Sequence, residues 1–525
     1  MEEIKVIELP EKSSVNAEDY LIVEDIDGTK KTMVRNFRSL VIKTIYFNNI
    51  DELKSSSNFA LKEGDICETL GYYYPGDGGG AKYKITYNPA AVEDKRLIHY
   101  LSYSDTLRAE LILGEKLNVH QFGAVGDGKT DDTDAIQAAI DNSDSYIIEF
   151  TNNKVYVTRN SININKSNTI INGNGATLYP HYVDGINISP DENASYINDV
   201  LINKLNFDCS KSSGAIYMYN ACNININGNV YNITNKGIHI KNSLFVNIND
   251  GTFTSINSGS SIILEGDEME NVLSLSSRFI NITNCLFQNF SKAIHVLSGN
   301  SNKKLNNVVN IKNCFYKSNT TNSHCIYITS PIEMMAIDSN AIEQAGTFLY
   351  FGGASEGCVS CKDISCLNTS NIFDIGTSNG ILNLEGNINT DANSILFKNM
   401  MGKIHSNINW NLLPNGSSFL NAPVGGELMD VIQPMNYNVN KGYSVYNNTL
   451  TLLEIRNIYV DWSSSTNNLA EIKNGIKGQL LYIKSSTNKS IMTVTNKILL
   501  SDSSVQLSNY KGILLKYDGL KWIQI

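Results

Sequence analysis

Short phrases rich in Asn and in β-branched residues recur between about residue 160 and residue 410, as in NININGNVYNITNKGIHIK and FINITNCLFQNFSKAIHV. Each phrase holds strands of roughly 4 to 6 residues, too short to pair stably within one phrase. Stacked on neighbours about 4.8 Å away, each strand would gain a ladder on both sides. The repeats therefore predict a parallel β-helix over residues 118–410, with Asn in the turns because it tolerates the left-handed backbone region.

The spacing of the phrases supports this interpretation. Their central isoleucines recur at intervals of roughly 20 to 35 residues, which is the period of a solenoid. An Asn-rich tract could instead be an aggregation-prone low-complexity segment, but regular Ile and Phe between the Asn residues favour a packed core. These central isoleucines are Ile226, Ile248, Ile282, Ile311, Ile337 and Ile364, and inward Ile, Leu, Val and Phe are expected to form continuous columns.

The entry to the repeats, NVHQFGAVGDGKTDDTDAIQAAI, contains a pattern that could be mistaken for a nucleotide site. Residues 123–130 match the phosphate-binding loop G-x-x-x-x-G-K-[ST] letter for letter. Four carboxylates, those of Asp127, Asp131, Asp132 and Asp134, would lie where the phosphates would bind. The preceding residues 118–122, read as a short strand, lack the apolar run of a central parallel strand. No nucleotide cofactor is expected.

The same segment predicts a helix at about residues 131–141. Asp131 or Asp132 can cap its first turn, and an apolar stripe follows at helical spacing. A solenoid needs an element that covers its first open coil, so we expect this helix to be the cap. The stripe consists of Ala135, Ile136, Ala139 and Ile140.

The flanking regions predict four smaller parts, all built from strands. Residues 1–42 read as short alternating strands, and residues 43–117 as a small domain with a tight loop at Pro75–Gly80. Residues 411–470 form a connecting region. Residues 471–525 alternate with a period of two between closely spaced turns, which predicts a compact antiparallel β-sandwich knob. The expected fold class is all-β.

Composition excludes several classes of function. A formal charge of -10 disfavours nucleic acid and anionic membrane surfaces as partners, because phosphate binding needs a basic face. No apolar run approaches the roughly 20 residues that span a bilayer, so membrane insertion is not expected. The N-terminus lacks the pattern of a signal peptide. Cys358, Cys361 and Cys366 lack a second ligand pair, so core thiols are expected rather than a metal site.

The entry motif carries a resemblance to a known family. F-G-A-x-G-D-G-x-T-D-D-T-x-A-I-Q-x-A-I, between Val119 and Ile140, resembles the entry motif of the pectate-lyase-like superfamily of right-handed β-helices. It is most similar to that of bacteriophage tailspikes and tail appendages. Residues 69–85 resemble a segment that precedes the motif in such spikes, and ELPEKSSVNAEDYLIVED resembles a tail attachment segment. The C-terminal strands resemble the distal knob of spikes from phages of Gram-positive hosts, and residues 411–465 match least.

The resemblance implies a right-handed parallel β-helix in a homotrimer. It implies that residues 1–42 bind other phage tail proteins and that the knobs face the host cell. The protein would be assembled in the host bacterial cytoplasm, reside in the tail of the virion and act at the host cell surface. Its implied partner is host cell-surface polysaccharide.

Many spikes of this kind degrade that polysaccharide, and degradation would need catalytic residues on the coils. Glycan hydrolysis needs two carboxylates about 5 to 9.5 Å apart, and elimination needs a base and a neutralised carboxylate. The densest acidic cluster comprises Glu265, Asp267 and Glu268, in a long spacer expected to project as a loop. The paired-Asp and Gly-His-Gly motifs of the polygalacturonase branch are absent. Other candidates are Asp208, Glu333, Asp338, Glu343, Asp363, Asp374, His239, His295 and His324.

Two functions therefore compete. One is a tail spike that recognises and degrades polysaccharide, by hydrolysis or by elimination, with Glu265, Asp267 and Glu268 as catalytic residues. The other is a non-enzymatic adhesive or structural appendage that binds teichoic acid or capsule. No cofactor and no metal are expected in either case.

Overall fold

The computed structural model describes most of the chain, and its parts fall into two units. The first comprises residues 1–125 and 134–150, and the second comprises residues 126–133 and 151–525. No described helix is long and apolar enough to cross a membrane. The described residues are 20–25, 28–33, 44–55, 61–94, 96–142, 147–190, 195–256, 259–266, 277–298, 306–352, 357–376, 380–390, 394–400, 403–412, 418–420, 428–431, 445–446, 449–451, 457–461, 468–469, 471–473, 480–484, 489–492, 498–500, 504–507, 512–518 and 520–524.

The first unit contains a hairpin and a five-stranded sheet. The hairpin pairs β1 (Tyr20–Asp25) with β2 (Gly28–Met33). The sheet has the order β3-β4-β5-β7-β6, and its buried face packs around Phe47, Leu53, Tyr83 and Ile85. Only the β3–β4 pair is parallel among the pairs of this sheet. The strands are β3 (Thr44–Phe47), β4 (Ile66–Thr69), β5 (Lys82–Tyr87), β6 (Ile98–Leu101) and β7 (Ser104–Leu111).

The predicted tight loop before β5 is organised by one carboxylate. Asp77 accepts hydrogen bonds from the backbone N–H groups of Tyr72, Tyr73, Tyr74 and Gly79, at 2.7 to 3.2 Å. These bonds hold the pKa of Asp77 below its usual value, although burial opposes them. The loop therefore owes its shape to this carboxylate as well as to its glycines.

Two short helices in the first unit were not predicted. Helix α2 (Ile50–Ser55) begins after Asn49, whose side chain accepts a hydrogen bond from the Glu52 N–H at 2.8 Å. The interpretation of residues 118–122 as a strand was wrong. Asn118 ends β8 (Lys116–Asn118), and the next four residues form a 3₁₀ helix, η1 (Val119–Phe122). Asn118 and Gln121 form a capping box there, and this pairing of side chain and backbone favours a helical turn over a strand.

The predicted entry helix is present as α3 (Thr133–Asp141). Asp131 accepts a hydrogen bond from the Thr133 N–H at 3.1 Å, in the manner of an N-cap. Ala135, Ile136, Ala139 and Ile140 are all buried, as the helical spacing predicted. Within the first unit, β8 also pairs in parallel with β10 (Ile147–Glu149).

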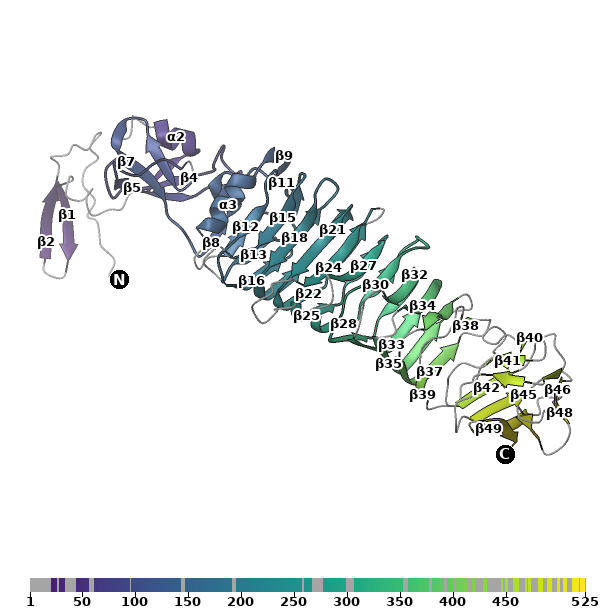
Figure 1. Ribbon diagram of the computed structural model, residues 1–525. Helices are drawn as coiled ribbons and strands as arrows, with labels where there is room; N and C mark the ends of the chain where they lie inside the picture. The colour runs from purple at the N-terminus through teal and green to yellow at the C-terminus, as the bar shows by residue number, and fades with distance from the viewer. Residues whose placement is uncertain are drawn as a thin grey trace. The chain divides into compact units, whose positions relative to one another are not determined.

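The second unit contains the predicted parallel β-helix, which is confirmed. Strands of successive coils pair in parallel in three rows, and the coils follow one another from teal to green (Figure 1). The first row consists of β13 (Ile170–Asn172), β16 (Ile197–Asn203), β19 (Ala221–Asn227), β22 (Leu244–Asn249), β25 (Ser277–Thr283), β28 (Asn306–Lys312), β31 (Met334–Asp338), β33 (Gly357–Cys366), β35 (Gly380–Thr390), β37 (Lys403–Leu412) and β39 (Leu428–Val431). The second consists of β9 (Asp127–Asp131), β11 (Val155–Thr158), β14 (Thr177–Pro180), β17 (Asn206–Asp208), β20 (Val230–Ile233), β23 (Thr252–Ser255), β26 (Leu286–Gln288) and β29 (Phe315–Lys317), and it continues along the first part of β32 (Ala341–Phe351) and the last parts of β33, β35 and β37. The third consists of β12 (Ile162–Ile164), β15 (Asp184–Ile188), β18 (Gly214–Tyr219), β21 (Lys236–Lys241), β24 (Ser260–Gly266), β27 (Lys292–Ser298), β30 (His324–Ile328), β32 (Ala341–Phe351), β34 (Thr369–Ile375), β36 (Ile395–Met400) and β38 (Ser418–Leu420).

The core of the β-helix is made of residue columns that run from coil to coil. In the first row, Ile226, Ile248, Ile282, Ile311 and Ile337 are register partners and are buried. Cys361 continues this column, whereas Ile364 pairs with Ile388. Period-two alternation shows which residues face inward, but it does not fix which inward residue of the next coil is the partner.

Asparagine has two roles outside this core. Asn284 and Asn313 follow first-row strands of adjacent coils with φ near +55°, the left-handed region that Asn tolerates. Asn225, Asn247, Asn281 and Asn310 form a ladder along the first row, joined by amide hydrogen bonds of 2.8 to 3.0 Å. The Asn-rich phrases thus supply both turns and inter-coil hydrogen bonds.

The parallel coils continue beyond the predicted end at about residue 410. Strand β37 pairs with β39, and β36 pairs with β38, so parallel pairing reaches Val431. In this part of the sequence the Asn-rich phrases give way to LLPNGSS and NAPVGG, so the repeat is no longer visible as a pattern.

The C-terminal strands form three sheets of mixed direction, not the purely antiparallel arrangement that was expected. β42 pairs with β45 in parallel, whereas β45 pairs with β49 in antiparallel fashion. Because β42 lies before residue 470, the expected connecting region contributes to this sheet. Alternation identifies buried faces but does not identify neighbouring strands. The sheets comprise β40 (Val445–Tyr446), β41 (Thr449–Thr451) and β44 (Glu471–Lys473); β42 (Asn457–Asp461), β45 (Leu480–Lys484), β49 (Gly512–Tyr517), β50 (Trp522–Gln524) and β47 (Ile498–Leu499); and β43 (Asn468–Leu469), β46 (Lys489–Met492) and β48 (Ser504–Leu507).

Candidate functional site

Glu265, the one member of the predicted catalytic cluster that the structure describes, contacts two basic groups of the preceding coil. Near the end of β24, its carboxylate lies 2.7 Å from Nε2 of His239 and 3.5 Å from Nζ of Lys241, both on β21. The three side chains are between 14% and 24% exposed, so the contacts are partly shielded from water. The hydrogen bond with His239, together with Lys241, lowers the pKa of Glu265 against the opposing effect of burial. At neutral pH Glu265 is therefore a carboxylate, suited to act as a base.

The remainder of the predicted cluster, Asp267 and Glu268, lies outside the described residues. In the described part of the third row, Glu265 has no second carboxylate at catalytic distance. Asp184 lies three coils before Glu265, and Asp374 lies four coils after it. At about 4.8 Å per coil these separations are roughly 14 and 19 Å, against at most about 9.5 Å for the two carboxylates of a glycosidase. Hydrolysis at Glu265 would therefore need a second carboxylate from outside the described residues of this row.

A column of aromatic and His side chains runs along the third row beside Glu265. Its members are register partners in consecutive coils and are half-buried, so each presents part of its surface to solvent. We call it the aromatic column, and it consists of Tyr217, His239, Ile263, His295, Tyr327 and Tyr350.

The rings of this column contact one another. Tyr327 and Tyr350 are stacked, with centroids 4.5 Å apart and planes 12° apart, and His295 meets Tyr327 edge-on at 5.3 Å. Nζ of Lys292 lies 4.6 Å from the Tyr327 ring centroid, at cation–π distance. The faces of the Tyr327 ring are therefore covered by Tyr350 and Lys292, and the column presents ring edges, phenolic hydroxyls and a cation. These groups can contact the C–H groups of sugars and bond their hydroxyls.

Burial keeps two histidines of this region neutral at physiological pH. It lowers the pKa of His295 to about 4, with Lys292 adding to the effect. It also lowers the pKa of His324, whose ring lies 4.7 Å from that of Tyr327. The positive charge beside Tyr327 therefore comes from Lys292 rather than from imidazolium groups.

The tyrosines of the aromatic column were not predicted from the sequence, although a signal for them is present. In each third-row phrase one residue lies between two inward apolar residues, as in IYM, IHI, IHV, IYI and LYF. The middle residue of each triplet faces outward by strand alternation. Reading those middle residues together would have revealed the column.

The other acidic candidates lie at separate places along the coils. Most of them are bonded to a residue of the neighbouring coil. Asp338 is paired with Lys312 at 3.4 Å and Glu343 with Lys317 at 2.6 Å, both across neighbouring coils. Asp208 accepts a hydrogen bond from the Asn232 side chain, Asp363 accepts one from the Asn387 N–H, and Asp374 is paired with Lys398. Glu333 is exposed between β30 and β31.

In the segment that matches the phosphate-binding loop, backbone N–H groups donate hydrogen bonds to carboxylates of the same segment. Asp127 accepts hydrogen bonds from the N–H groups of Lys129 and Thr130, at 2.8 and 2.7 Å. Asp132, which is 1% exposed, accepts one from the Gly126 N–H at 3.1 Å. The backbone donors that a phosphate would need are therefore already bonded to anions.

Among the residues that the structure describes, no group of three or more His, Cys, Asp or Glu side chains is arranged to hold a metal ion. The cysteine trio lies mainly in the core. Cys361 and Cys366 are buried, and burial raises the pKa of the Cys361 thiol.

Comparisons with known proteins yield matches at the level of structure. No family model matches the sequence, and no curated protein matches it. The tailspike gp42 of Acinetobacter phage vb_AbaP_AS12 is similar over 92% of this chain and 94% of its own, with 11% identity and a TM-score of 0.57. Pantoea stewartii WceF, described as a glycan biofilm modifying enzyme with a tailspike-like fold, has a TM-score of 0.44 at 15% identity, over 68% of this chain and 52% of its own. Polygalacturonase from Erwinia carotovora has a TM-score of 0.43 at 11% identity, over 57% of this chain and 94% of its own.

Of these three, the Acinetobacter phage tailspike alone has a TM-score above 0.5. Because the sequences are 11% identical, this likeness bears on the fold and not on the activity. The chain thus has the parallel β-helix fold of phage tailspike proteins.

Proposed function

We propose that this chain is a tail spike protein that binds host cell-surface polysaccharide along the third row of its β-helix. The observation that carries the proposal is the aromatic column, in which Tyr327 and Tyr350 stack and Lys292 lies over the Tyr327 ring. A tail spike of this fold acts where a virion meets the cell surface, so a polymeric glycan is the ligand that fits both the setting and the column.

The geometry of the column suits a polymer better than a small ligand. Its members repeat once per coil, about 4.8 Å apart, along a straight row of register partners. An extended chain of pyranose rings advances by a similar step per sugar. One polymer chain can therefore make the same kind of contact in several coils, and weak contacts add up along its length.

The wider setting belongs to the same proposal. Residues 1–42 would attach the protein to other tail components, and three copies of the chain would associate as a homotrimer. The C-terminal strands of residues 471–525 would face the host cell. These assignments are supported by the resemblance of the terminal segments to tail spikes and by the fold.

A polysaccharide depolymerase is the second candidate, and the contact between Glu265 and His239 favours it. An ionised Glu265 can itself act as the base, and Lys241 can neutralise a substrate carboxylate. Elimination would remove a proton beside the carboxylate of a uronic acid and break the neighbouring glycosidic C–O bond, leaving a double bond. Ultraviolet absorbance of unsaturated products reports elimination, and new reducing ends without it report hydrolysis.

Binding of the full-length chain to immobilised cell-wall and capsular polysaccharides from Gram-positive bacteria tests the main candidate. We expect binding to at least one polysaccharide of such a panel. Changing Tyr327→Ala and Tyr350→Ala together should weaken it by about tenfold or more, as expected for central aromatic contacts.

Tyr182→Ala is the matched control, because Tyr182 is 82% exposed and lies outside the aromatic column. It should leave binding unchanged. Circular dichroism and the unfolding midpoint establish that the double variant is folded. A folded double variant that binds as tightly as the natural chain would contradict the assignment to the aromatic column, and no binding across the panel would contradict the function.

A further inference from the structure

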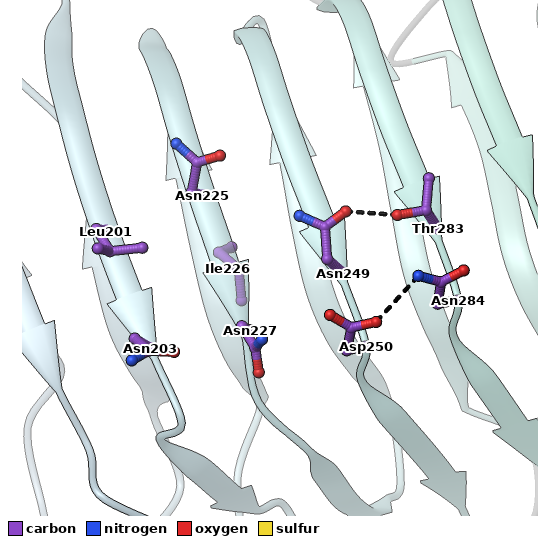
Figure 2. Close-up of a pocket in the computed structure, with 9 residues that line it drawn as sticks. All are labelled: Leu201, Asn203, Asn225, Ile226, Asn227, Asn249, Asp250, Thr283 and Asn284. Atoms are coloured by element: carbon purple, nitrogen blue, oxygen red, sulfur yellow. Dashed lines mark hydrogen bonds between the residues drawn. The ribbon is translucent and has the colours of Figure 1, made fainter.

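A second surface of the β-helix, on the first row, is hollowed. Figure 2 shows the hollow across β16, β19, β22 and β25, with amide side chains around it. Its volume is about 530 Å³, within the range of small-ligand sites. We call it the amide groove, and it is lined by Leu201, Asn203, Asn225, Ile226, Asn227, Asn249, Asp250, Thr283 and Asn284.

Some of these amides have a structural role, because they bond neighbouring coils, whereas others have no such bond. Asn225 belongs to the inter-coil ladder and accepts a hydrogen bond from Asn247 at 3.0 Å. Asn249 accepts one from Thr283 at 2.5 Å, drawn as a dashed line in Figure 2. Asn203 and Asn227, which are register partners one coil apart, make no side-chain hydrogen bond in the described part of the chain. Two adjacent amides at the groove therefore offer their donors and acceptors to solvent or to a ligand.

The charge and shape of the groove restrict that ligand. Its lining contains no Lys or Arg and one carboxylate, Asp250, which accepts a hydrogen bond from Asn284 at 3.1 Å. A polyanion would meet this carboxylate without a compensating cation. Leu201, which is 38% exposed, adds an apolar surface beside the amides. Amides, one carboxylate and one aliphatic patch can bond hydroxyl groups and contact the C–H face of a sugar ring.

We propose that the amide groove binds an uncharged saccharide, with Asn203 and Asn227 as hydrogen-bonding residues and Leu201 under the sugar ring. This site is separate from the aromatic column, because its residues lie on the first row whereas the column lies on the third. The inference does not depend on the proposed function, and either site can bind its ligand without the other.

Saturation-transfer NMR and calorimetry with defined tetrasaccharides test this site on the full-length chain. The probes are maltotetraose, cellotetraose and chitotetraose, which are neutral, and tetragalacturonate, which is anionic. We expect at least one neutral probe to bind. Changing Asn203→Ala and Asn227→Ala together should weaken that binding about tenfold, the loss expected for two neutral hydrogen bonds. Any binding of tetragalacturonate should not respond to this change.

Asn163→Ala with Asn187→Ala is the matched control, because these two amides lie one coil apart on the third row, outside the groove. It should leave binding of the neutral probe unchanged. The Tyr327→Ala, Tyr350→Ala variant should also keep it, which separates this site from the aromatic column. Absence of binding by all three neutral probes, or equal binding by the folded Asn203, Asn227 variant, would overturn the proposal.

Discussion

Burial of His295 in the aromatic column gives the β-helix a pH-dependent stability. The pKa of this histidine falls from its ordinary value of 6.5 to about 4, because the folded state disfavours the charged imidazolium. Between these pH values the unfolded chain takes up a proton that the folded chain does not. The free energy of unfolding must therefore fall as the pH is lowered from about 6.5 to about 4.

We predict that His295→Gln, which removes the titrating group, reduces this loss of stability. Between pH 7 and pH 5 the natural chain should lose on the order of 1 kcal/mol more than the variant. Urea unfolding followed by circular dichroism at the two pH values measures the difference. An equal pH dependence in both proteins would show that His295 titrates normally in the folded state.

At the level of single residues, the sequence predicted some of the left-handed backbone positions and not others. Asn at left-handed turn positions was expected, and Asn284 and Asn313 occupy such positions. Phe245 and Phe279 also have positive φ values, with their rings stacked at 4.8 Å, and this was not foreseeable. Asn223 and Val308, at the same register position in the neighbouring coils, also have positive φ values, so the repeated geometry of the first row sets this conformation and not the intrinsic preference of the residue.

At the scale of strands, alternation predicted the coils but not every register. Inward columns of apolar residues were predicted, whereas the residues that share a column, such as Ile337 with Cys361, were not. Helix α2 was missed even though Asn49 and Glu52 carry a capping signal. Partners in a solenoid depend on the exact length of each turn, and that length follows from three-dimensional packing rather than from local pattern.

The candidate site has the same division between what sequence could and could not predict. Glu265 was singled out from its acidic neighbours, but its partner His239 precedes it by 26 residues, one coil away. Spacing alone could not join them. The contact arises because β21 and β24 pair in parallel, with Lys241 opposite Glu265.

If the chain cleaves polysaccharide, the β21–β24 pair makes a specific prediction. Glu265→Gln should reduce cleavage by roughly 10²- to 10⁴-fold, the usual contribution of acid–base catalysis, and should leave polysaccharide binding intact. Glu343→Gln is the control, because it also removes a carboxylate paired with a Lys of a neighbouring coil, at 2.6 Å. Cleavage that survives in the Glu265 variant would exclude this residue as a catalytic group, whereas loss in both variants would point to damaged coils.

For the whole molecule, the proposal places glycan recognition on the lateral surface of the β-helix. The C-terminal strands, some of which contribute buried residues such as Leu481, Ile483 and Trp522, form small mixed sheets. They are the competing location, because a terminal knob could also contact the cell.

The most direct test is a crystal structure of the full-length protein with an oligosaccharide derived from the polysaccharide that it binds. We predict sugar rings along the third row, in contact with Tyr327 and Tyr350 and beside Lys292. An oligosaccharide bound only to the strands after residue 440, with the third row unoccupied, would contradict the proposed function of the aromatic column.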